Sequence, residues 1–455
     1  MATLTELNRQ QILAQRRQRL AHQYPGAVVL WSGQPVARNF PANVYPFRAS
    51  SHFLYFAGQS LVNAAIKLDQ GIATLFMDDP APGAALWHGP VSSRDQVAAQ
   101  INASAAYPLA DLAQHLPEAT MLPNQAGLSG QLPENNFETD GAAANALAAA
   151  IATVRLSHDD LALQQIKTAA SVSVQAHVAG MAATPTATTA AQVRAAMEQV
   201  IIGHNMTCAY NSIVTIHGEV LHNEQYHYPI APGDLLLADV GAEAVSGWAS
   251  DITRTWPVSG QFSPTQRAIY NVVLAAHDAC IAAAKPGVEY RDIHLLACRT
   301  LAAGLADIGL LRGDPDSLVE RDVHALFFPH GVGHLLGLDV HDMEDLGDVA
   351  GYAPGRSRSP RFGLKYLRLD RPLAANMVVT IEPGFYQVPG ILHPARQSGE
   401  YDDAVNWARL DRFQDVRGIR IEDDVQITAE GCTVLTADLP TQADAIEALV
   451  LPGRK

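Results

Sequence analysis

Cysteine is scarce in this chain of 455 residues, which contains only four. They are scattered, without a CxxC pair, at Cys208, Cys280, Cys298 and Cys432. A chain of this length can bury stable cores without disulfide bonds. We therefore expect reduced thiols and a cytoplasmic protein.

Motifs of several common enzyme classes are absent. The sequence has no GxSxG motif of serine hydrolases, no GK[ST] phosphate loop and no HExxH motif of helical zinc sites. The glycines at positions 331, 333 and 337 miss the GxGxxG spacing by one residue. Serine hydrolase chemistry and nucleotide binding are therefore disfavoured.

Basic residues are too few to balance the acidic ones: 31 Lys and Arg against 46 Asp and Glu give a net charge of −15. No local basic stripe offsets this charge, so nucleic acids and anionic membranes are poor partners. The longest alanine-rich stretch, residues 141–154, is too short to cross a bilayer. The arginine-rich residues 1–20 lack the apolar core of a signal peptide and predict an amphipathic helix.

The second half of the chain has acidic residues beside apolar stretches. Asp239 and Asp251 flank a glycine-containing turn, which predicts a β-hairpin with one carboxylate on each strand. Glu382 follows one apolar run, and Glu422 follows another. Burying carboxylates without partners is costly, so we expect cations between them.

Three histidines, His330, His334 and His341, stand close together among glycines and apolar residues. His330 and His334 have the i, i+4 spacing of a helical zinc motif, but the intervening glycines predict irregular or extended backbone close to a ligand. Lone histidines such as His277 and His324 are expected to be hydrogen-bonded core groups.

The chemistry of the combined set predicts a two-metal hydrolase, although any one acid alone would be interpreted as a turn residue. Four carboxylates and one imidazole suit a pair of Mn²⁺, Co²⁺ or Zn²⁺ ions better than a structural zinc, which favours Cys and His. Because thiolates are absent from these segments, we favour Mn²⁺. The candidate ligands are Asp239, Asp251, His334, Glu382 and Glu422.

Four segments, DVGAE…SDITRT, HGVGHLLGLDVHD, TIEPGFY and RIEDD, resemble the signature blocks of one enzyme family. They are similar to those of the pita-bread metallopeptidases, which include methionine aminopeptidase, aminopeptidase P and prolidase. The resemblance extends over residues 158–430. One departure is that Asp251 follows Asp239 by 12 positions, where the family more often has one fewer. We expect a longer hairpin turn around Ser246.

The resemblance implies a role for each ligand. Asp239 would bind one metal ion only, whereas Asp251 and Glu422 would bridge two ions. His334 and Glu382 would complete the two metal shells.

The resemblance also implies a substrate site. His222, His330 and His341 match histidines that line it, and Arg420 matches an arginine of the substrate pocket. His330 or His341 would donate a hydrogen bond to the developing oxyanion. Glu382 would pass a proton to the departing nitrogen.

A break near residues 130–158 predicts two domains, 1–157 and 158–455. The first is expected to be an α/β domain with strands at 27–33, 51–58 and 71–79. The second is expected to be an α+β pita-bread catalytic domain. Its first helices are predicted at 159–181, 188–205, 264–284 and 290–309.

Two segments bear on the choice of activity. YPFRASSHFLYFAG (45–58), with ALWHG (85–89), resembles the N-terminal domain of aminopeptidase P and its prolidase relatives, which methionine aminopeptidase lacks. Residues 387–416 are more similar to bacterial prolidases. We favour an Xaa-Pro aminopeptidase acting on proline-containing peptides, with an Xaa-Pro dipeptidase as the alternative. A binding or scaffold protein is a second alternative, but such proteins replace several ligands.

The resemblance further implies a homodimer or homotetramer in which Trp87 reaches the site of a neighbouring subunit; the alternative is a core tryptophan. The Gly-, Pro- and Arg-rich segment 343–368 is expected to be a loop over the site or a solvated connector.

Overall fold

The computed structural model describes residues 6–116, 119–122 and 141–451, and the chain divides into two units. One unit holds Met1–Leu161 and Met343–Ala350; the other holds Ala162–Asp342 and Gly351–Lys455. The domain boundary between residues 157 and 158 stays a prediction. In the described part of the chain, no helix combines the length and apolar character that a membrane span requires.

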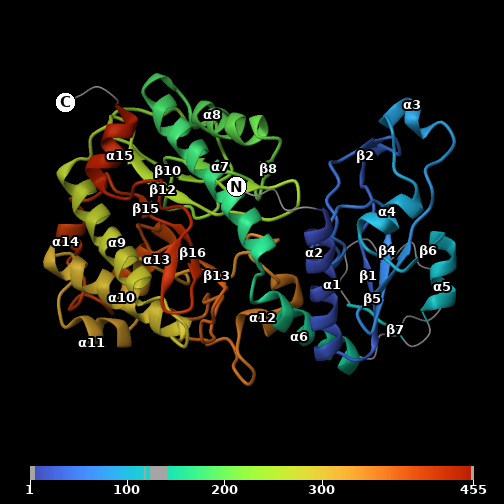
Figure 1. Cartoon of the computed structure of the whole chain (residues 1–455). Helices are drawn as coiled ribbons and strands as arrows, with labels where there is room; N and C mark the ends of the chain where they lie inside the picture. The colour runs from blue at the N-terminus through green and yellow to red at the C-terminus, as the bar shows by residue number, and fades with distance from the viewer. Residues whose placement is uncertain (1–5, 117–118, 123–140, 452–455) are drawn as a thin grey trace. The chain divides into compact units, whose positions relative to one another are not determined.

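The first unit is built on a five-stranded sheet. Its strands, in spatial order, are β6 (Ala105–Tyr107), β5 (Ile72–Phe76), β4 (Ala65–Asp69), β1 (Ala27–Trp31) and β7 (Ala119–Thr120) (Figure 1). The central pairs β1 with β4 and β4 with β5 are antiparallel, whereas the two edge strands pair in parallel. The predicted strands at 27–33 and 71–79 are therefore confirmed.

Helices and a short hairpin complete this unit. The helices are α1 (Glu6–Gln23), α2 (Ser51–Ala57), α3 (Ala84–His88), α4 (Arg94–Gln100), η1 (Leu109–Asp111), α5 (Leu112–His115), α6 (Gly141–Arg155) and η4 (Glu344–Leu346), and the hairpin is β2 (Ala37–Phe40) with β3 (Asn43–Val44).

The strand predicted at 51–58 is wrong, because these residues form helix α2. The Ser50 side chain caps the helix by accepting from the Phe53 amide, and Gly58 ends it at a positive φ of 77°. Every residue of α2 is buried. A helix that is buried on all sides lacks the 3.6-residue period that would distinguish it from a buried strand.

Helix α2 also joins residues 343–350 to the first unit. The His52 Nε2 atom lies 2.9 Å from Asp345 Oδ2, and the Arg155 Nη1 atom lies 2.8 Å from His52 Nδ1. Because a guanidinium only donates, Nδ1 accepts and the Nε2–H donates to Asp345.

The second unit carries two three-stranded and two two-stranded sheets. These are β12 (Thr253–Pro257), β10 (Leu235–Asp239) and β9 (Ile213–Thr215); β13 (Val378–Ile381), β16 (Asp423–Ile427) and β17 (Cys432–Val434); β14 (Gly384–Tyr386) with β15 (Gly418–Arg420); and β11 (Ala242–Glu243) with β8 (Thr207–Cys208).

The four helices predicted for this part of the chain are confirmed as α7 (Asp160–Ala183), α8 (Ala190–Gly203), α9 (Pro264–Ala283) and α10 (Tyr290–Asp307). Ser263 and Gln266 form a capping box that starts α9, with Pro264 at its first position. Helices α9 and α10 pack side by side (Figure 1). The shorter helices of this unit are η2 (Thr184–Thr186), α11 (Pro315–Glu320), η3 (Val323–Leu326), α13 (Pro389–Ser398), α14 (Trp407–Leu410) and α15 (Ala443–Val450). Helix α12 (Asp348–Gly351) lies mostly within residues 343–350 of the first unit.

Candidate metal centre and active site

The predicted hairpin places two of the acidic side chains. Asp239 ends β10 and lies opposite Thr253 of β12, while Asp251 lies two residues before β12. The hairpin turns at residues 244–248, where the Gly247 amide bonds to the Ala244 carbonyl. Gly241 is required here, because a Cβ atom would lie 1.8 Å from the Ser250 carbonyl oxygen of the facing segment.

Glu382 and Glu422 stand at the ends of a second strand pair. Glu382 follows β13, and Glu422 precedes the antiparallel strand β16. A β-bridge between Thr253 and Glu422 joins this pair to the hairpin, and the Thr253 Oγ1 atom donates to Glu422 Oε2 at 2.6 Å. All four carboxylates therefore meet where the two sheets adjoin.

His334 reaches the same place from irregular backbone, as the glycines around it predicted. A Cβ atom on Gly333 would lie 2.1 Å from the Thr380 carbonyl oxygen, so only glycine permits this close passage. The His334 Nδ1–H donates to the Leu335 carbonyl at 3.0 Å, which leaves Nε2 as the ligand atom.

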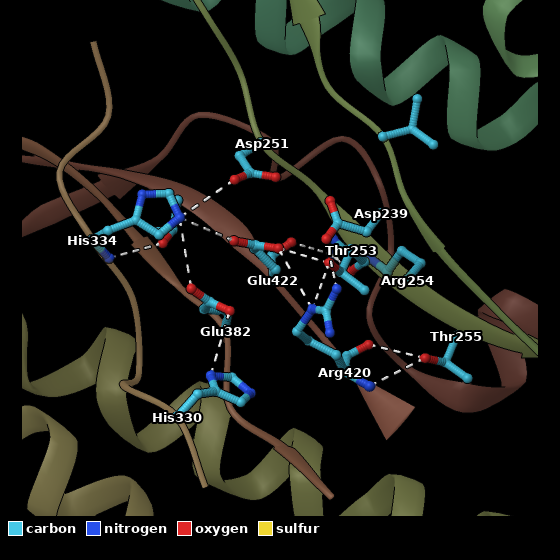
Figure 2. A network of polar contacts seen from close by, with 12 residues as sticks. Asp239, Asp251, Thr253, Arg254, Thr255, His330, His334, Glu382, Arg420 and Glu422 are labelled. Atoms are coloured by element: carbon cyan, nitrogen blue, oxygen red, sulfur yellow. Dashed lines mark hydrogen bonds and ion pairs between the residues drawn. The ribbon is translucent and has the colours of Figure 1, made fainter. Parts of the chain in front are cut away.

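The Nε2 atom of His334 faces three carboxylates (Figure 2). It lies 3.4 Å from Asp251 Oδ2, 3.6 Å from Glu382 Oε1 and 4.0 Å from Glu422 Oε1. Ligand atoms of Asp251, His334 and Glu422 all lie within 4.8 Å of one another. These separations fit a shared cation.

The electrostatics of the cluster also call for a cation. Burial raises the pKa of Asp251, Glu382 and Glu422 well above the ordinary carboxyl values. Mutual repulsion adds to the shift of each pKa, chiefly from Asp239 on Asp251, from Glu422 on Glu382 and from Asp251 on Glu422. Divalent cations would remove this repulsion, and the oxygen-rich donor set suits them.

Asp239 has a different environment. Its Oδ2 atom lies 2.5 Å from Arg420 Nη2, and its Oδ1 atom lies 2.5 Å from the Tyr210 hydroxyl. The same hydroxyl lies 2.5 Å from Asp251 Oδ1. One phenol hydrogen cannot serve two ionised carboxylates at once, so an additional proton or a cation is needed between Asp239 and Asp251.

His330 is held as a neutral ring. Its Nδ1–H donates to the Gly331 carbonyl at 2.8 Å, so Nε2 accepts from the Tyr386 hydroxyl at 2.8 Å. Tyr386 in turn accepts from Arg420 Nη1 at 3.1 Å. Burial, aided by the charge of Arg420, lowers the pKa of His330 to about 3. In this arrangement the one ring N–H of His330 is engaged by the chain.

A cavity of about 750 Å³ opens on the cluster. All nine site residues named from the sequence line it: the five candidate ligands, His222, His330, His341 and Arg420. The His341 ring packs edge to face on His334, with centroids 4.3 Å apart. Segment 351–370 contributes Arg358, Phe362, Lys365, Tyr366 and Arg368, so the loop predicted over the site lines it in part.

Sequence reasoning missed several residues of the site. Tyr210 bonds to candidate ligands but stands in no recognised motif, and Thr253 stands within SDITRT but was not singled out. Tyr386 stands within TIEPGFY, yet only its contacts with His330 and Arg420 reveal its place. Glu219 lines the cavity from the loop before His222.

A second buried network supports the cluster from behind. Arg254 donates to the Glu422 carbonyl at 2.6 Å and to Asp423 Oδ1 at 2.8 Å. His277 Nε2 lies 3.0 Å from Asp423 Oδ2, so His277 is a buried, partnered histidine as expected. His324 is also buried and lies outside the cavity lining.

Known proteins share both units of the chain. Residues 164–429 match Metallopeptidase family M24, and residues 13–126 match the Aminopeptidase P, N-terminal domain. A protein named "Probable Xaa-Pro aminopeptidase PEPP" from Uncinocarpus reesii is 32% identical over 430 residues, covering 90% of this chain and 86% of its own length. A "Probable Xaa-Pro aminopeptidase" from Fusarium vanettenii is 33% identical over 421 residues, with 89% and 88% covered.

Solved structures agree with these relatives. The aminopeptidase PepP of Pseudomonas aeruginosa superposes with a TM-score of 0.79 at 28% identity, covering 97% of this chain and 98% of that one. Zinc-substituted aminopeptidase P from E. coli, in complex with product, gives 0.79 at 26% identity, covering 98% and 99%. The predicted α/β N-terminal domain and α+β pita-bread catalytic domain are confirmed, and prolidase is not favoured. The chain therefore belongs to metallopeptidase family M24 and, with its aminopeptidase P N-terminal domain, is a metallo-exopeptidase.

Proposed function

We propose that this enzyme releases the N-terminal residue from peptides with proline in the second position. The observation that carries the proposal is the convergence of four carboxylates and His334 at one cavity, which His222 and His341 also line. Val388 and Ile391 add apolar surface to the same cavity, which suits a proline ring that has no N–H to offer. The relatives named Xaa-Pro aminopeptidase support this substrate class.

We propose that two divalent ions, Mn²⁺ by preference and Zn²⁺ or Co²⁺ as alternatives, complete the site. Asp239, Asp251, His334, Glu382 and Glu422 would hold them, with Asp251 and Glu422 shared. Bound divalent ions lower the pKa of water and polarise a carbonyl group, which are the two requirements of amide hydrolysis.

Side chains of the protein itself would stabilise the oxyanion, transfer the proton and position the site. His341 would donate to the developing oxyanion, because the ring N–H of His330 is already engaged by Gly331. Glu382 would carry the proton of the attacking water to the departing proline nitrogen. Arg420 would hold Asp239 and Tyr386 in place at the cavity wall.

Of residues 387–416, only Val388 and Ile391 line the cavity. Ile391 lies in the first turn of α13, and the rest of α13 and all of α14 contribute no residue to the cavity lining. Such an arrangement supports a site that accepts residues beyond proline, as an aminopeptidase requires.

A hydrolysis assay tests the function. We expect cleavage of Ala-Pro-Ala at the Ala-Pro bond, loss of cleavage on chelation, and recovery with Mn²⁺, because the acidic cluster needs cations. Metal content is measured in parallel by mass spectrometry. Ala-Ala-Ala serves as the control for proline. Cleavage of the dipeptide Ala-Pro alone would point to a prolidase, and full activity without metal would reject the metal centre.

We also propose a cytoplasmic homodimer or homotetramer. Trp87 is 80% exposed, so its interpretation as a core tryptophan is wrong. Its neighbour Leu86 is 79% exposed, and an exposed apolar pair suits a subunit contact. We expect light scattering to give a dimer or tetramer mass, and Trp87→Ser to lower it.

Ile202→Ser is the matched control, since Ile202 is an exposed apolar residue on α8. A fully active wild-type monomer would remove the oligomer proposal.

A further inference from the structure

Lys365 stands out among the cationic side chains of the cavity. Its Nζ atom lies 4.7 Å from the ring centroid of Tyr366 and 5.5 Å from that of Phe362. All three residues line the cavity, and we name them the lysine clamp. Within the described residues, the Lys365 ammonium has no ion pair and no hydrogen bond. Arg420, by contrast, is bonded to Asp239.

The backbone holds the lysine clamp in place. The Leu364 and Lys365 amides both bond to the Arg361 carbonyl, at 3.0 and 2.8 Å, so the segment turns tightly. Arg361 Nε donates to Asp322 Oδ2 at 2.9 Å, and the His294 Nε2–H donates to the Gly363 carbonyl at 2.9 Å. A backbone fixed in this way loses less entropy when Lys365 binds a ligand.

The charge balance of the cavity determines which ligand suits Lys365. Five carboxylates and four cationic side chains line it. Two divalent ions would therefore turn the formal charge of the lining positive. A half-buried ammonium flanked by aromatic faces, in a cavity of that sign, would bind an anion.

We propose that Lys365 selects peptides that carry a carboxylate beyond the proline, either the free C-terminus of a short peptide or an acidic side chain of a longer one. This inference rests on the proposed Xaa-Pro aminopeptidase function. A cavity of about 750 Å³ has the size that accommodates a drug-sized ligand, which leaves room for residues after the scissile bond.

Four peptides test the inference, in two matched pairs. The first pair is Ala-Pro-Ala with a free C-terminus and the same peptide amidated. The second pair is Ala-Pro-Glu-amide and Ala-Pro-Gln-amide. We expect wild-type kcat/KM to be about tenfold higher for the carboxylate in at least one pair, because a charge-assisted hydrogen bond forms. The pair that shows the preference identifies the source of the carboxylate, and added salt should weaken the preference.

Lys365→Met removes the charge and keeps the aliphatic chain. We expect it to abolish the preference, measured as the ratio of kcat/KM within each pair, and Lys365→Arg to retain the preference. Lys167→Met, at an exposed position of α7 outside the cavity lining, is the control and should behave as wild type.

Three results would overturn the inference in different ways. Equal cleavage within both pairs by the wild type would show that no carboxylate is selected. An equal loss on all peptides in Lys365→Met would show that Lys365 only supports the loop. Absence of any Xaa-Pro cleavage by the wild type would reject the proposed function itself, and this inference with it.

Discussion

We expect Glu422→Gln to lower kcat/KM by about three orders of magnitude and to reduce the amount of bound metal. The substitution keeps the shape of the side chain but removes one of four charges that surround the cation site. The Thr253 hydroxyl, 2.6 Å from Glu422 Oε2, can still bond to the amide oxygen. The substitution therefore removes a charge and leaves the packing of the side chain unchanged. Metal content by mass spectrometry and hydrolysis of Ala-Pro-Ala are measured on the same preparation.

His341→Ala is the matched comparison. His341 packs on His334 without being a proposed ligand, so its loss should lower the rate by about a hundredfold and leave the metals bound. Metal loss as complete as in Glu422→Gln would contradict these roles. A folding defect is distinguished by thermal unfolding in chelator, where Glu422→Gln should be at least as stable as wild type because one repelling carboxylate is gone.

Arg254→Met is expected to destabilise the second unit by about 3–5 kcal/mol, because it leaves the buried Asp423 carboxylate without its arginine partner. Arg254 is 0% exposed, and beyond Glu422 and Asp423 it donates to the carbonyls of Thr253, Leu439 and Pro440. Denaturant unfolding at pH 7, followed by circular dichroism, measures the change in the free energy of unfolding.

The same variant should change the acid response. Burial alone would raise the pKa of Asp423, but Arg254, His277 and Thr436 outweigh it and lower the pKa to about 2. A lowered carboxyl pKa stabilises the fold at neutral pH, and this contribution is lost as pH falls from about 4 towards 2. Arg254→Met should weaken that pH dependence, because His277 and Thr436 still contact Asp423.

Arg321→Met removes an exposed pair with Asp403 and serves as the control. Exposed pairs contribute little to stability, so no measurable change is expected. If Arg254→Met lowered the free energy of unfolding no more than this control does, the buried network would not contribute to stability.

The sequence was most informative where residues conflict with their surroundings. Acidic residues beside apolar strands are costly unless something compensates them, and this conflict pointed to Asp239, Asp251, Glu382 and Glu422 before any geometry was known. Tyr210 offered no such signal, because tyrosine is common both in buried cores and in functional sites. Its link between Asp239 and Asp251 depends on segments distant in the sequence.

Two features of the fold were hidden for related reasons. Helix α2 is buried on every side, so its sequence has no polar face to reveal the helical period. The first unit includes residues 343–350, which begin two positions after His341. These residues stand far along the sequence from the rest of the first unit, and local sequence patterns do not reveal contacts between such distant segments.

The inclusion of residues 343–350 in the first unit limits how far the two units can be separated. Met343 and Ala350 are each 1% exposed, and Asp345 bonds to His52 of helix α2. A shortened gene that began at residue 162 would encode these residues without the unit to which they belong. The chain on either side of them carries His341 and Arg358 to the cavity. The N-terminal unit is therefore not an interchangeable module that could be lost in evolution while the peptidase unit stayed intact.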